Sequence, residues 1–407
     1  MAVGRIGTLL AMEFNPFSPE FYDDPYDMYR WLRDEAPTYH NEQYNFWALS
    51  RFSDVVDASR DWKTFSSEHG LTIDQLNDPD NAMKHSSIIM MDPPAHDRMR
   101  KLVSRVFTPR AIGRLEPMVR EVITEFLSPL EGAREFDLVA DFSAPFPVEI
   151  ISRILGVPKE DRQQIRLWTD DMLHRDEDDH RPTQAGMEAG LHQLLYFLEL
   201  IKEKRAKPAD DMLSRLTEVE VADDDGNLNK LTDEEIAGFG TLIAAAGSET
   251  VTKQVGNGVV LFARNPDEWK KLLADRAKAV NAVEEVLRYW APSQYQGRFS
   301  HADSEWHGVT IPAGSPVLLL TGAANRDERE YEDPDRFDID REIGLGLGLG
   351  HGIHSCLGAA VARLESRVAF EEIAERWPEY EVDEGGLKRV HMSNVAGFSN
   401  VPVAVAA

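Results

Sequence analysis

Apolar residues recur every three or four positions along most of the chain, which predicts a mainly helical protein. Shorter runs rich in β-branched and aromatic residues predict strands, arranged as small sheets beside the helical body. The expected fold class is therefore mainly α with small β-sheets (α+β). The expected helices are residues 25–35, 95–106, 111–127, 185–204, 233–264 and 277–289, with another starting near Gly358. The expected strands are residues 46–50, 294–299, 309–312 and 317–320.

No internal repeat, Gly/Ser-rich linker or proline-rich low-complexity tract divides the 407 residues. The length alone allows one large domain or two medium ones, and a hydrophobic content of 42% is ample for a sizeable core. Because nothing marks a boundary, we expect residues 1–407 to form a single domain.

The segment 233–264 predicts an unusually long helix, about 45 Å at ~1.5 Å per residue. Thr232 and Glu235 form a capping-box pattern at its start, and Asn265-Pro266 ends it. A helix of this length must cross the core of the protein. Its centre, Ala246-Gly-Ser-Glu-Thr250, carries small and polar residues where packing alone would favour leucine or isoleucine.

This central cluster predicts a local groove in the long helix. Gly247 costs roughly 1 kcal/mol relative to alanine in a helix interior, and the Thr250 hydroxyl can bond back to the Ala246 carbonyl, opening the helical ladder. A groove flanked by Glu249 and Thr250 suits the binding and protonation of a small polar ligand such as dioxygen. The alternative is a helix kink with an exposed glutamate.

Cys356 is the only cysteine of the chain, and it lies just before the helix that starts near Gly358. The N–H groups and dipole of a helix N-terminus lower the pKa of a thiol, and the thiolate is the form that binds metals. A lone cysteine can also be an inert small apolar residue. Two further alternatives are a nucleophile paired with His354 or His351, and a phosphate-binding loop formed by Gly346, Gly348, Gly350 and Gly352; the second lacks a convincing preceding strand.

A formal net charge of −27 argues against nonspecific binding to nucleic acid or anionic membranes. Between Arg98 and Arg120, however, seven basic residues stand against the single acid Glu116. Such a stretch is either a solvated helix face or a docking surface for an acidic partner.

The N-terminal apolar stretch is short and interrupted by Arg5, so we expect neither a transmembrane anchor nor a secretory signal. A single cysteine fits a reducing compartment, and a cytoplasmic location is expected. Translation could start at Met1 or Met12.

Four motifs together resemble the cytochrome P450 family, over nearly the entire chain. They are the cysteine loop from Leu349 to Gly358, the helix centre from Ala246 to Thr250, the pair Glu285-Val-Leu-Arg288, and Asp92-Pro-Pro-Ala-His-Asp-Arg-Met-Arg100. Leu349 stands where the family usually has phenylalanine. Glu and Arg at i, i+3 are commonly a surface ion pair; the resemblance instead implies a buried pair that supports the cysteine loop together with residues 325–327 and 333–337.

The resemblance implies a haem-thiolate monooxygenase that holds haem b between the long helix and the cysteine-loop helix. Cys356 would be the axial ligand of the iron. The other implied cofactor-binding residues are His96, Arg100, Arg298 and His354, which would bind the haem propionates, together with Ala246 and Gly350.

The activity implied is insertion of one atom of O2 into a C–H or C=C bond of an apolar small molecule. Thr250 would hold the bound oxygen and an ordered water, and Glu249 would relay protons from solvent. Two electrons would come from a separate ferredoxin-type donor with its reductase, docked on the basic residues of 98–120 with Arg363 and Arg367. A peroxide-using variant, and a haem carrier or gas sensor without catalysis, are the alternatives.

The resemblance also implies the walls of the substrate pocket. They are residues 70–91, 172–195, 242–246, 293–296 and 395–398. Met90, Leu242, Ile243, Val395 and Phe398 suggest a mostly apolar ligand, and Ser293, Gln294 and Gln296 could bind one polar group. Fatty acids, terpenoids, steroids and small aromatics all fit this description.

Overall fold

A computed structural model describes residues 13–78, 87–105, 112–176, 181–222, 228–392 and 394–405. The described helices are α1 (Pro19–Asp23), α2 (Tyr26–Glu35), α3 (Phe52–Arg60), α4 (Ile73–Leu76), α5 (Ala95–Val103), α7 (Glu116–Leu127), α8 (Pro145–Leu155), α9 (Arg162–Leu173), α10 (Gln184–Ala206), α11 (Met212–Glu218), α12 (Asp233–Arg264), α13 (Pro266–Ala274), α14 (Ala279–Tyr289), α15 (Thr321–Ala324) and α16 (Ala359–Arg376). The expected fold class, mainly α with small sheets, is confirmed.

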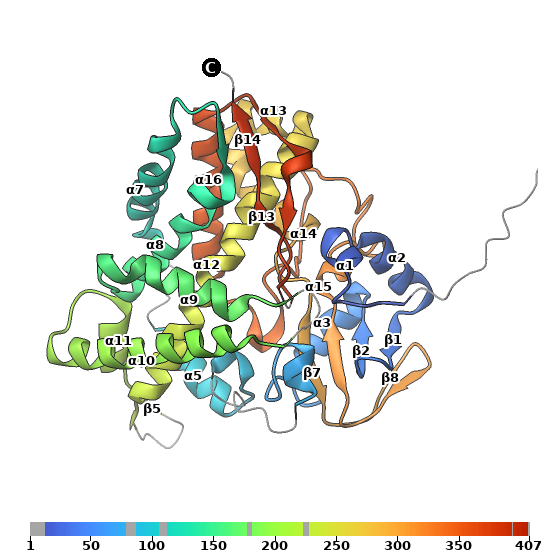
Figure 1. Cartoon of the computed structure of the whole chain (residues 1–407). Coiled ribbons are helices and arrows are strands. Elements are labelled where there is room, and N and C mark those ends of the chain that lie inside the picture. The colour runs from blue at the N-terminus through green and yellow to red at the C-terminus, as the bar shows by residue number, and fades with distance from the viewer. Residues whose placement is uncertain are drawn as a thin grey trace, which may run out of the picture.

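The strands are short. They are β1 (Thr38–Asn41), β2 (Phe46–Leu49), β3 (Phe65–Ser66), β4 (Glu135–Asp137), β5 (Val221–Ala222), β6 (Leu228–Asn229), β7 (Gln296–Ser300), β8 (Ser304–Trp306), β9 (Val309–Ile311), β10 (Pro316–Leu319), β11 (Tyr380–Val382), β12 (Lys388–Arg389), β13 (Phe398–Asn400) and β14 (Pro402–Val405). The largest sheet has the order β1-β2-β10-β7-β3, in which only β2 and β10 pair in parallel. It lies beside the helical body (Figure 1).

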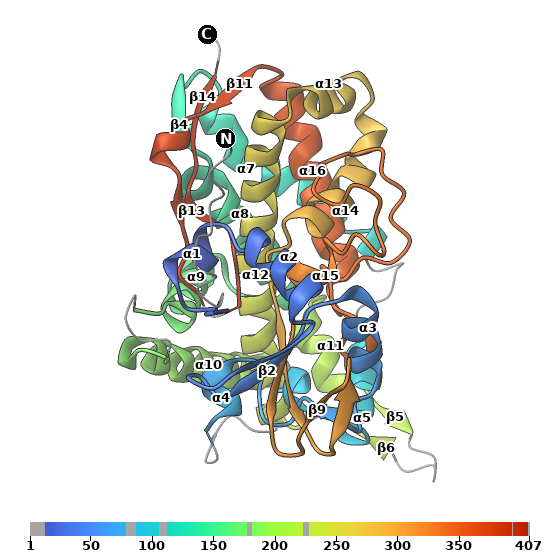
Figure 2. The same ribbon diagram turned by 90° about the vertical axis from the view of Figure 1, so that its right-hand side faces the viewer.

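Helix α12 is the central element of the fold, and its bounds are those expected from the sequence. The capping box forms, because the Thr232 backbone N–H donates to Glu235 (2.8 Å) and the Glu235 N–H donates to the Thr232 hydroxyl (3.2 Å). Helices α8, α9, α10, α14 and α16 pack around α12, which runs the length of the molecule (Figure 2). A helix that is apolar on most sides is stable only when it is surrounded in this way.

Two apolar cores meet at α12. One contains Ile236 to Ala244 of its N-terminal half, and the other contains Val251 to Phe262 of its C-terminal half. Residues 245–250 belong to neither core. The motif identified in the sequence therefore lies where the apolar packing along the central helix is interrupted.

The other expected elements agree with the structure to within a few residues, except that α7 begins at Glu116 rather than at residue 111. Residues 106–111, which include that expected start, lie outside the described residues. Pattern reading did not identify α8 or α9, the two helices that cover the middle of α12. Among the described residues, no helix is long and apolar enough to cross a membrane.

Candidate active site

The cysteine loop is a tight turn that leads into α16. Gly350 and Gly352 have φ values of +70° and +72°, a conformation that favours glycine. A Cβ atom on Gly352 would collide with the Ser59 carbonyl oxygen. The Cys356 N–H donates to the Leu349 carbonyl at 2.9 Å, and α16 begins three residues after the cysteine. These contacts fix the position of the thiol relative to the helix, as the sequence predicted.

The Cys356 thiol is exposed, although protein surrounds it closely enough that burial raises its pKa. The Gly358 N–H, Arg100 and Arg363 act in the opposite direction and lower the pKa of this thiol. The expectation of a lowered thiol pKa was therefore wrong for the protein alone, because desolvation outweighs the helix N-terminus.

The middle of α12 has one open side. Ala246 is exposed, and Leu242 and Thr250 are partly exposed, whereas Ser248 and Glu249 beside them are buried. Residues 242, 246 and 250 are four apart and share one helix face. The Thr250 hydroxyl donates to the Ala246 carbonyl at 2.7 Å, as predicted, but the helix continues unbroken through this point.

The cysteine loop and the N-terminal half of α12 border the same apolar core. Leu357, which follows the cysteine, packs against the apolar core that contains Ile243 and Ala244. Leu242, on the open side of α12, packs against that core as well. This is the arrangement expected if a flat cofactor lies between the loop and the long helix.

Glu249 is positioned differently from the expectation. Its side chain is 8% exposed, and its Oε1 lies 2.6 Å from Nζ of Lys253, which is also buried. A glutamate enclosed in this way has little contact with bulk water. Sequence analysis did not identify Lys253, although its i, i+4 spacing from Glu249 is a known signal for an ion pair.

The four predicted propionate-binding residues come together from three elements. His96 and Arg100 lie on α5, Arg298 on β7 and His354 in the cysteine loop. The rings of His96 and His354 are 4.6 Å apart, and the Arg100 guanidinium donates to the Ser355 carbonyl at 2.8 Å. Burial, followed by Arg298, His96 and Arg100, lowers the pKa of His354 to about 2. Burial also lowers the pKa of Arg298 to about 10.

This cluster fits a bound anion. Buried donors of like charge repel each other, and Nε2 of both His96 and His354 is buried with no hydrogen-bond partner among the described residues. Carboxylates placed among these groups would satisfy the free donors and offset the repulsion. The residues present therefore fit the two propionates of a haem.

A buried ion pair on α14 is connected by hydrogen bonds to the residues before the cysteine loop. Glu285 Oε2 and Arg288 Nε are 2.7 Å apart and both side chains are fully buried. Arg288 also donates to the Asn325 carbonyl at 3.0 Å, and the Asn325 side chain accepts the Leu347 N–H at 2.9 Å. The prediction of a buried rather than a surface pair is confirmed. Its hydrogen bonds extend to the residues just before the loop.

Several expected pocket residues have other partners. Gln294 is fully buried, accepts from the Tyr29 hydroxyl at 3.1 Å and donates to the Ala291 carbonyl at 2.6 Å, so it is not available to a ligand. Phe398 packs in the core on Trp290. Ser293 and Gln296 are partly exposed, with the Gln296 amide donating to the Ser293 hydroxyl at 2.6 Å. Part of the expected wall, residues 79–86 and 177–180, lies outside the described residues.

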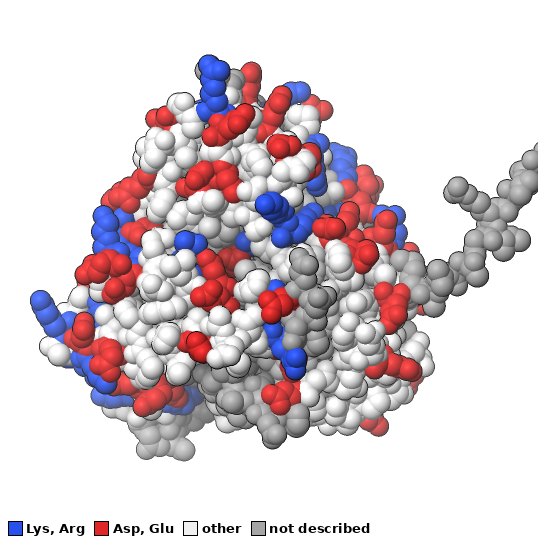
Figure 3. All heavy atoms as spheres, in the orientation of Figure 1, with Lys and Arg blue, Asp and Glu red and all other residues white. Residues whose placement is uncertain are grey.

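Two of the seven basic residues of the stretch from Arg98 to Arg120 pair with nearby acids. Arg98 pairs with Glu235, and Arg120 pairs with Glu116 and Glu371. Arg363 and Arg367 pair in the same way with Glu284 and Glu116, and Arg110 lies outside the described residues. Basic and acidic side chains are similarly intermingled on the face shown in Figure 3. Part of the expected electropositive docking face is therefore engaged in internal ion pairs.

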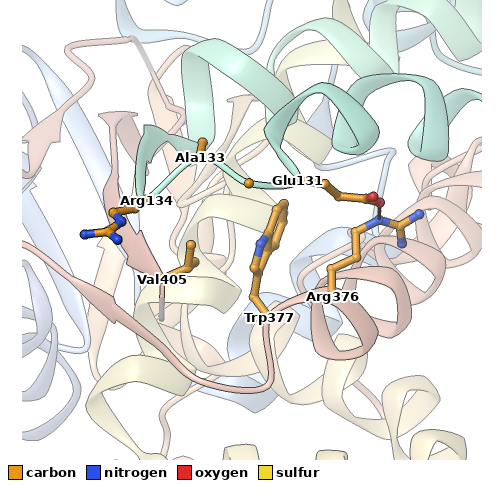
Figure 4. Close-up of a pocket in the computed structure, with 7 residues that line it drawn as sticks. Glu131, Ala133, Arg134, Arg376, Trp377 and Val405 are labelled. Carbon is orange, nitrogen blue, oxygen red and sulfur yellow. Dashed lines mark hydrogen bonds and ion pairs between the residues drawn. The ribbon is translucent and has the colours of Figure 1, made fainter. Parts of the chain in front are cut away.

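A separate cavity of about 640 Å³ lies near the C-terminus. Trp377 lines it between Arg134 and the Glu131–Arg376 ion pair, whose atoms are 3.0 Å apart (Figure 4). None of the predicted site residues lines this cavity, so it is distinct from the site between α12 and the cysteine loop.

Comparison with known proteins agrees with this geometry. The sequence model of the family Cytochrome P450 matches residues 38–385. "Putative cytochrome P450 123" of Mycobacterium tuberculosis is 42% identical over 394 residues, 97% of each chain. "Vitamin D(3) 25-hydroxylase" of Pseudonocardia autotrophica is 37% identical over 414 residues, 99% of this chain and 98% of that one. The crystal structure of CYP109E1 from Bacillus megaterium in complex with testosterone has a TM-score of 0.87 and 31% identity, covering 96% of this chain and all of that one.

The fold and these relatives define a monooxygenase that binds haem through a cysteine thiolate. The chain belongs to the cytochrome P450 family.

Proposed function

We propose that this protein hydroxylates or epoxidises a steroid-sized apolar molecule, with Cys356 as the axial ligand of its haem. The observation that carries the proposal is the pair of buried, unpartnered Nε2 atoms of His96 and His354, which lie with Arg100 beside the loop of the exposed Cys356. His96, Arg100, Arg298 and His354 would hold the propionates, and Ala246 and Gly350 would border the ring. The bound haem supplies the chemistry by which one atom of O2 enters a C–H or C=C bond.

Two side chains of α12, Glu249 and Thr250, would bind and transfer the protons that oxygen activation consumes. The Thr250 hydroxyl donates its own hydrogen to the Ala246 carbonyl, so its oxygen can accept a hydrogen bond from a water in the open space beside it. Glu249, buried next to it and ion-paired with Lys253, would pass protons toward that water. Glu249 and Thr250 are thus the proposed catalytic pair.

The electrons would come from a separate ferredoxin-type protein and its reductase. The sequence has one cysteine, so it cannot itself hold a four-cysteine iron–sulfur cluster. Because Arg98, Arg363 and Arg367 are ion-paired, docking through these three residues would require exchange of internal ion pairs for intermolecular ones.

The steroid-sized substrate is supported by relatives. One is a vitamin D(3) 25-hydroxylase, and CYP109E1 has been crystallised with testosterone and with corticosterone. Ser293 and Gln296, which are partly exposed, could bind a hydroxyl or keto group of such a molecule. A second relative of known structure was crystallised with a fatty-acyl carrier protein, so lipid chains are the main competing class.

The substrate proposal predicts a spectral result. Titration of the ferric protein with testosterone, vitamin D3, hexadecenoic acid and a small aromatic should give the tightest blue shift of the Soret band with one of the first two. A steroid fills more of an apolar pocket and so gains more free energy of burial than a small aromatic. A tighter response to the fatty acid would move the proposal to lipid chains.

Replacing Thr250 with alanine should leave haem binding intact and uncouple the reaction. Proton delivery contributes roughly 10²–10⁴-fold to a rate, so the product formed per electron pair should fall by about tenfold or more. Electron consumption and product are measured together.

Thr252 is the matched control for this substitution. It has the same side chain two residues further on, but it is buried and donates to the Ser143 carbonyl at 2.9 Å. Thr252→Ala should lower stability without changing coupling. If both variants uncouple equally, the open face of α12 has no special role in proton delivery.

A further inference from the structure

Three side chains with metal-binding atoms come together beside β3, an edge strand of the largest sheet. One carboxylate oxygen of Glu68, one of Asp92 and a ring nitrogen of His301 all lie within 4.8 Å of one another. Glu68 follows β3, Asp92 precedes α5 and His301 follows β7. The group therefore joins three segments that are distant in the sequence, and none of its members is among the proposed haem-binding or catalytic residues.

Backbone hydrogen bonds fix the three segments against each other. The His301 N–H donates to the Thr64 carbonyl at 2.8 Å, next to the antiparallel pairing of β3 with β7. Asp92 Oδ1 accepts the Ser67 N–H at 3.1 Å, which holds the residue before Glu68. The positions of the three side chains are thus set by the backbone contacts around them.

Asp92 is a buried carboxylate without an ion-pair partner. It is 7% exposed, and the Ser67 N–H is its one hydrogen-bond donor among the described residues, none of which forms an ion pair with it. Burial lowers the pKa of Arg298 and Asp92 opposes this shift, but the Arg298 guanidinium donates to the Gly297 carbonyl at 2.7 Å and not to Asp92. Buried charges are normally paired or bound to a metal ion. The burial of Asp92 therefore points to a cation, independently of the distances within the group.

The other two side chains can reach a shared ion. Glu68 is partly exposed and His301 is exposed, so both can rotate without disturbing the core. No residue in the described part of the chain forms a hydrogen bond to the His301 ring, which contacts the rings of His69 and Phe299. Ligand atoms at about 2.0–2.2 Å from one Zn²⁺ ion are at most about 4.4 Å apart. A small rotation of either exposed side chain would bring the three atoms within that limit.

We propose that Glu68, Asp92 and His301 bind one Zn²⁺ ion, with water completing its coordination. A ring nitrogen combined with carboxylate oxygens is a ligand set typical of Zn²⁺, whereas Mg²⁺ and Ca²⁺ take oxygen ligands. The ion compensates the buried charge of Asp92 and joins the end of β3 to β7 and to the start of α5. The inference does not depend on the substrate or on the roles of Glu249 and Thr250.

The first test is calorimetric titration of the complete haem-bound protein with Zn²⁺, after dialysis against EDTA. The parent should bind one ion, and a large excess of Mg²⁺ should not displace it. Loss of a group that merely supports a metal ligand costs about 10–100-fold in affinity, so His301→Ala, which removes a ligand, should weaken binding by about tenfold or more. No binding of Zn²⁺ by the parent, or its displacement by Mg²⁺, would overturn the inference.

His307→Asn is the matched control. His307 is also an exposed histidine beside a carboxylate, with Nε2 2.7 Å from Asp54 Oδ2, but it belongs to no group of three potential ligands in the described part of the chain. Asparagine tolerates the positive φ of +52° at this position. This variant should bind Zn²⁺ like the parent. Equal weakening by His301→Ala and His307→Asn would mean that surface histidines bind zinc in general, and the proposed site would be wrong.

A second test examines the ligands and the role of Asp92. Zinc-edge X-ray absorption of the loaded protein should contain the scattering of one imidazole, which His301→Ala removes. Zn²⁺ should also raise the Tm of the parent, because it binds the folded state, but not the Tm of Asp92→Asn, whose amide oxygen can still accept the Ser67 N–H. A zinc-bound parent without imidazole scattering, or the same rise in Tm for Asp92→Asn, would contradict the proposal.

Discussion

Replacing Cys356 with alanine is expected to abolish the red-shifted Soret band of the reduced, carbon-monoxide-bound protein, and with it the monooxygenase activity. An axial thiolate is the ligand by which cytochromes P450 favour cleavage of the O–O bond. Cys356 is the only cysteine, so no other thiolate in the chain can replace it. The measurement is the difference spectrum after reduction with dithionite and addition of carbon monoxide, together with product formation under turnover.

Ser355→Ala is a suitable control for this substitution. It changes the adjacent residue but leaves the Ser355 carbonyl that accepts the Arg100 hydrogen bond. This variant should keep the red-shifted band. If Cys356→Ala retained that band, thiolate ligation by this chain would be excluded, and the proposed function would fall with it.

The long helix shows what local sequence can predict. The bounds of α12 followed from a capping box at Thr232 and an Asn-Pro stop at residue 265, both of which act through neighbouring residues. The Thr250–Ala246 hydrogen bond is also local, because its partners are one helical turn apart. In contrast, α8 and α9 were missed. Most of α8 is buried, including Glu149 and Ser152, so no polar face marks it, whereas α9 buries only Ile165 and Thr169 and so has a weak apolar signal.

The motifs predicted which residues belong to the site. They did not predict how deeply those residues are buried or which side chains they contact. His96, Arg298 and His354 do meet, although they come from distant parts of the chain. The burial of Gln294 could not be foreseen, because its partner Tyr29 is 265 residues away. The raised pKa of the Cys356 thiol likewise depends on which elements pack together, and the spacing of residues within one segment does not reveal this.

Replacing Glu285 with glutamine is expected to destabilise the protein by about 3–5 kcal/mol, because it leaves a buried guanidinium without its countercharge. Arg288 is 1% exposed and holds the carbonyls of Asn325 and Pro334, so its displacement would also disturb the residues that anchor Leu347 before the cysteine loop. Haem content should therefore fall together with the free energy of unfolding. Both quantities can be measured on the purified variant, by the absorbance of released haem and by denaturant unfolding.

Glu284→Gln is the matched control, one residue earlier on α14. Glu284 pairs with Arg363 at the surface, where the two side chains are 27% and 46% exposed. Screening by water limits such a pair to about 0–1 kcal/mol, so this variant should unfold almost like the parent and keep its haem. The contrast between adjacent substitutions isolates the effect of burial from that of charge. If the two variants lost the same stability, the Glu285–Arg288 pair would not be the support of the cysteine loop that its hydrogen bonds indicate.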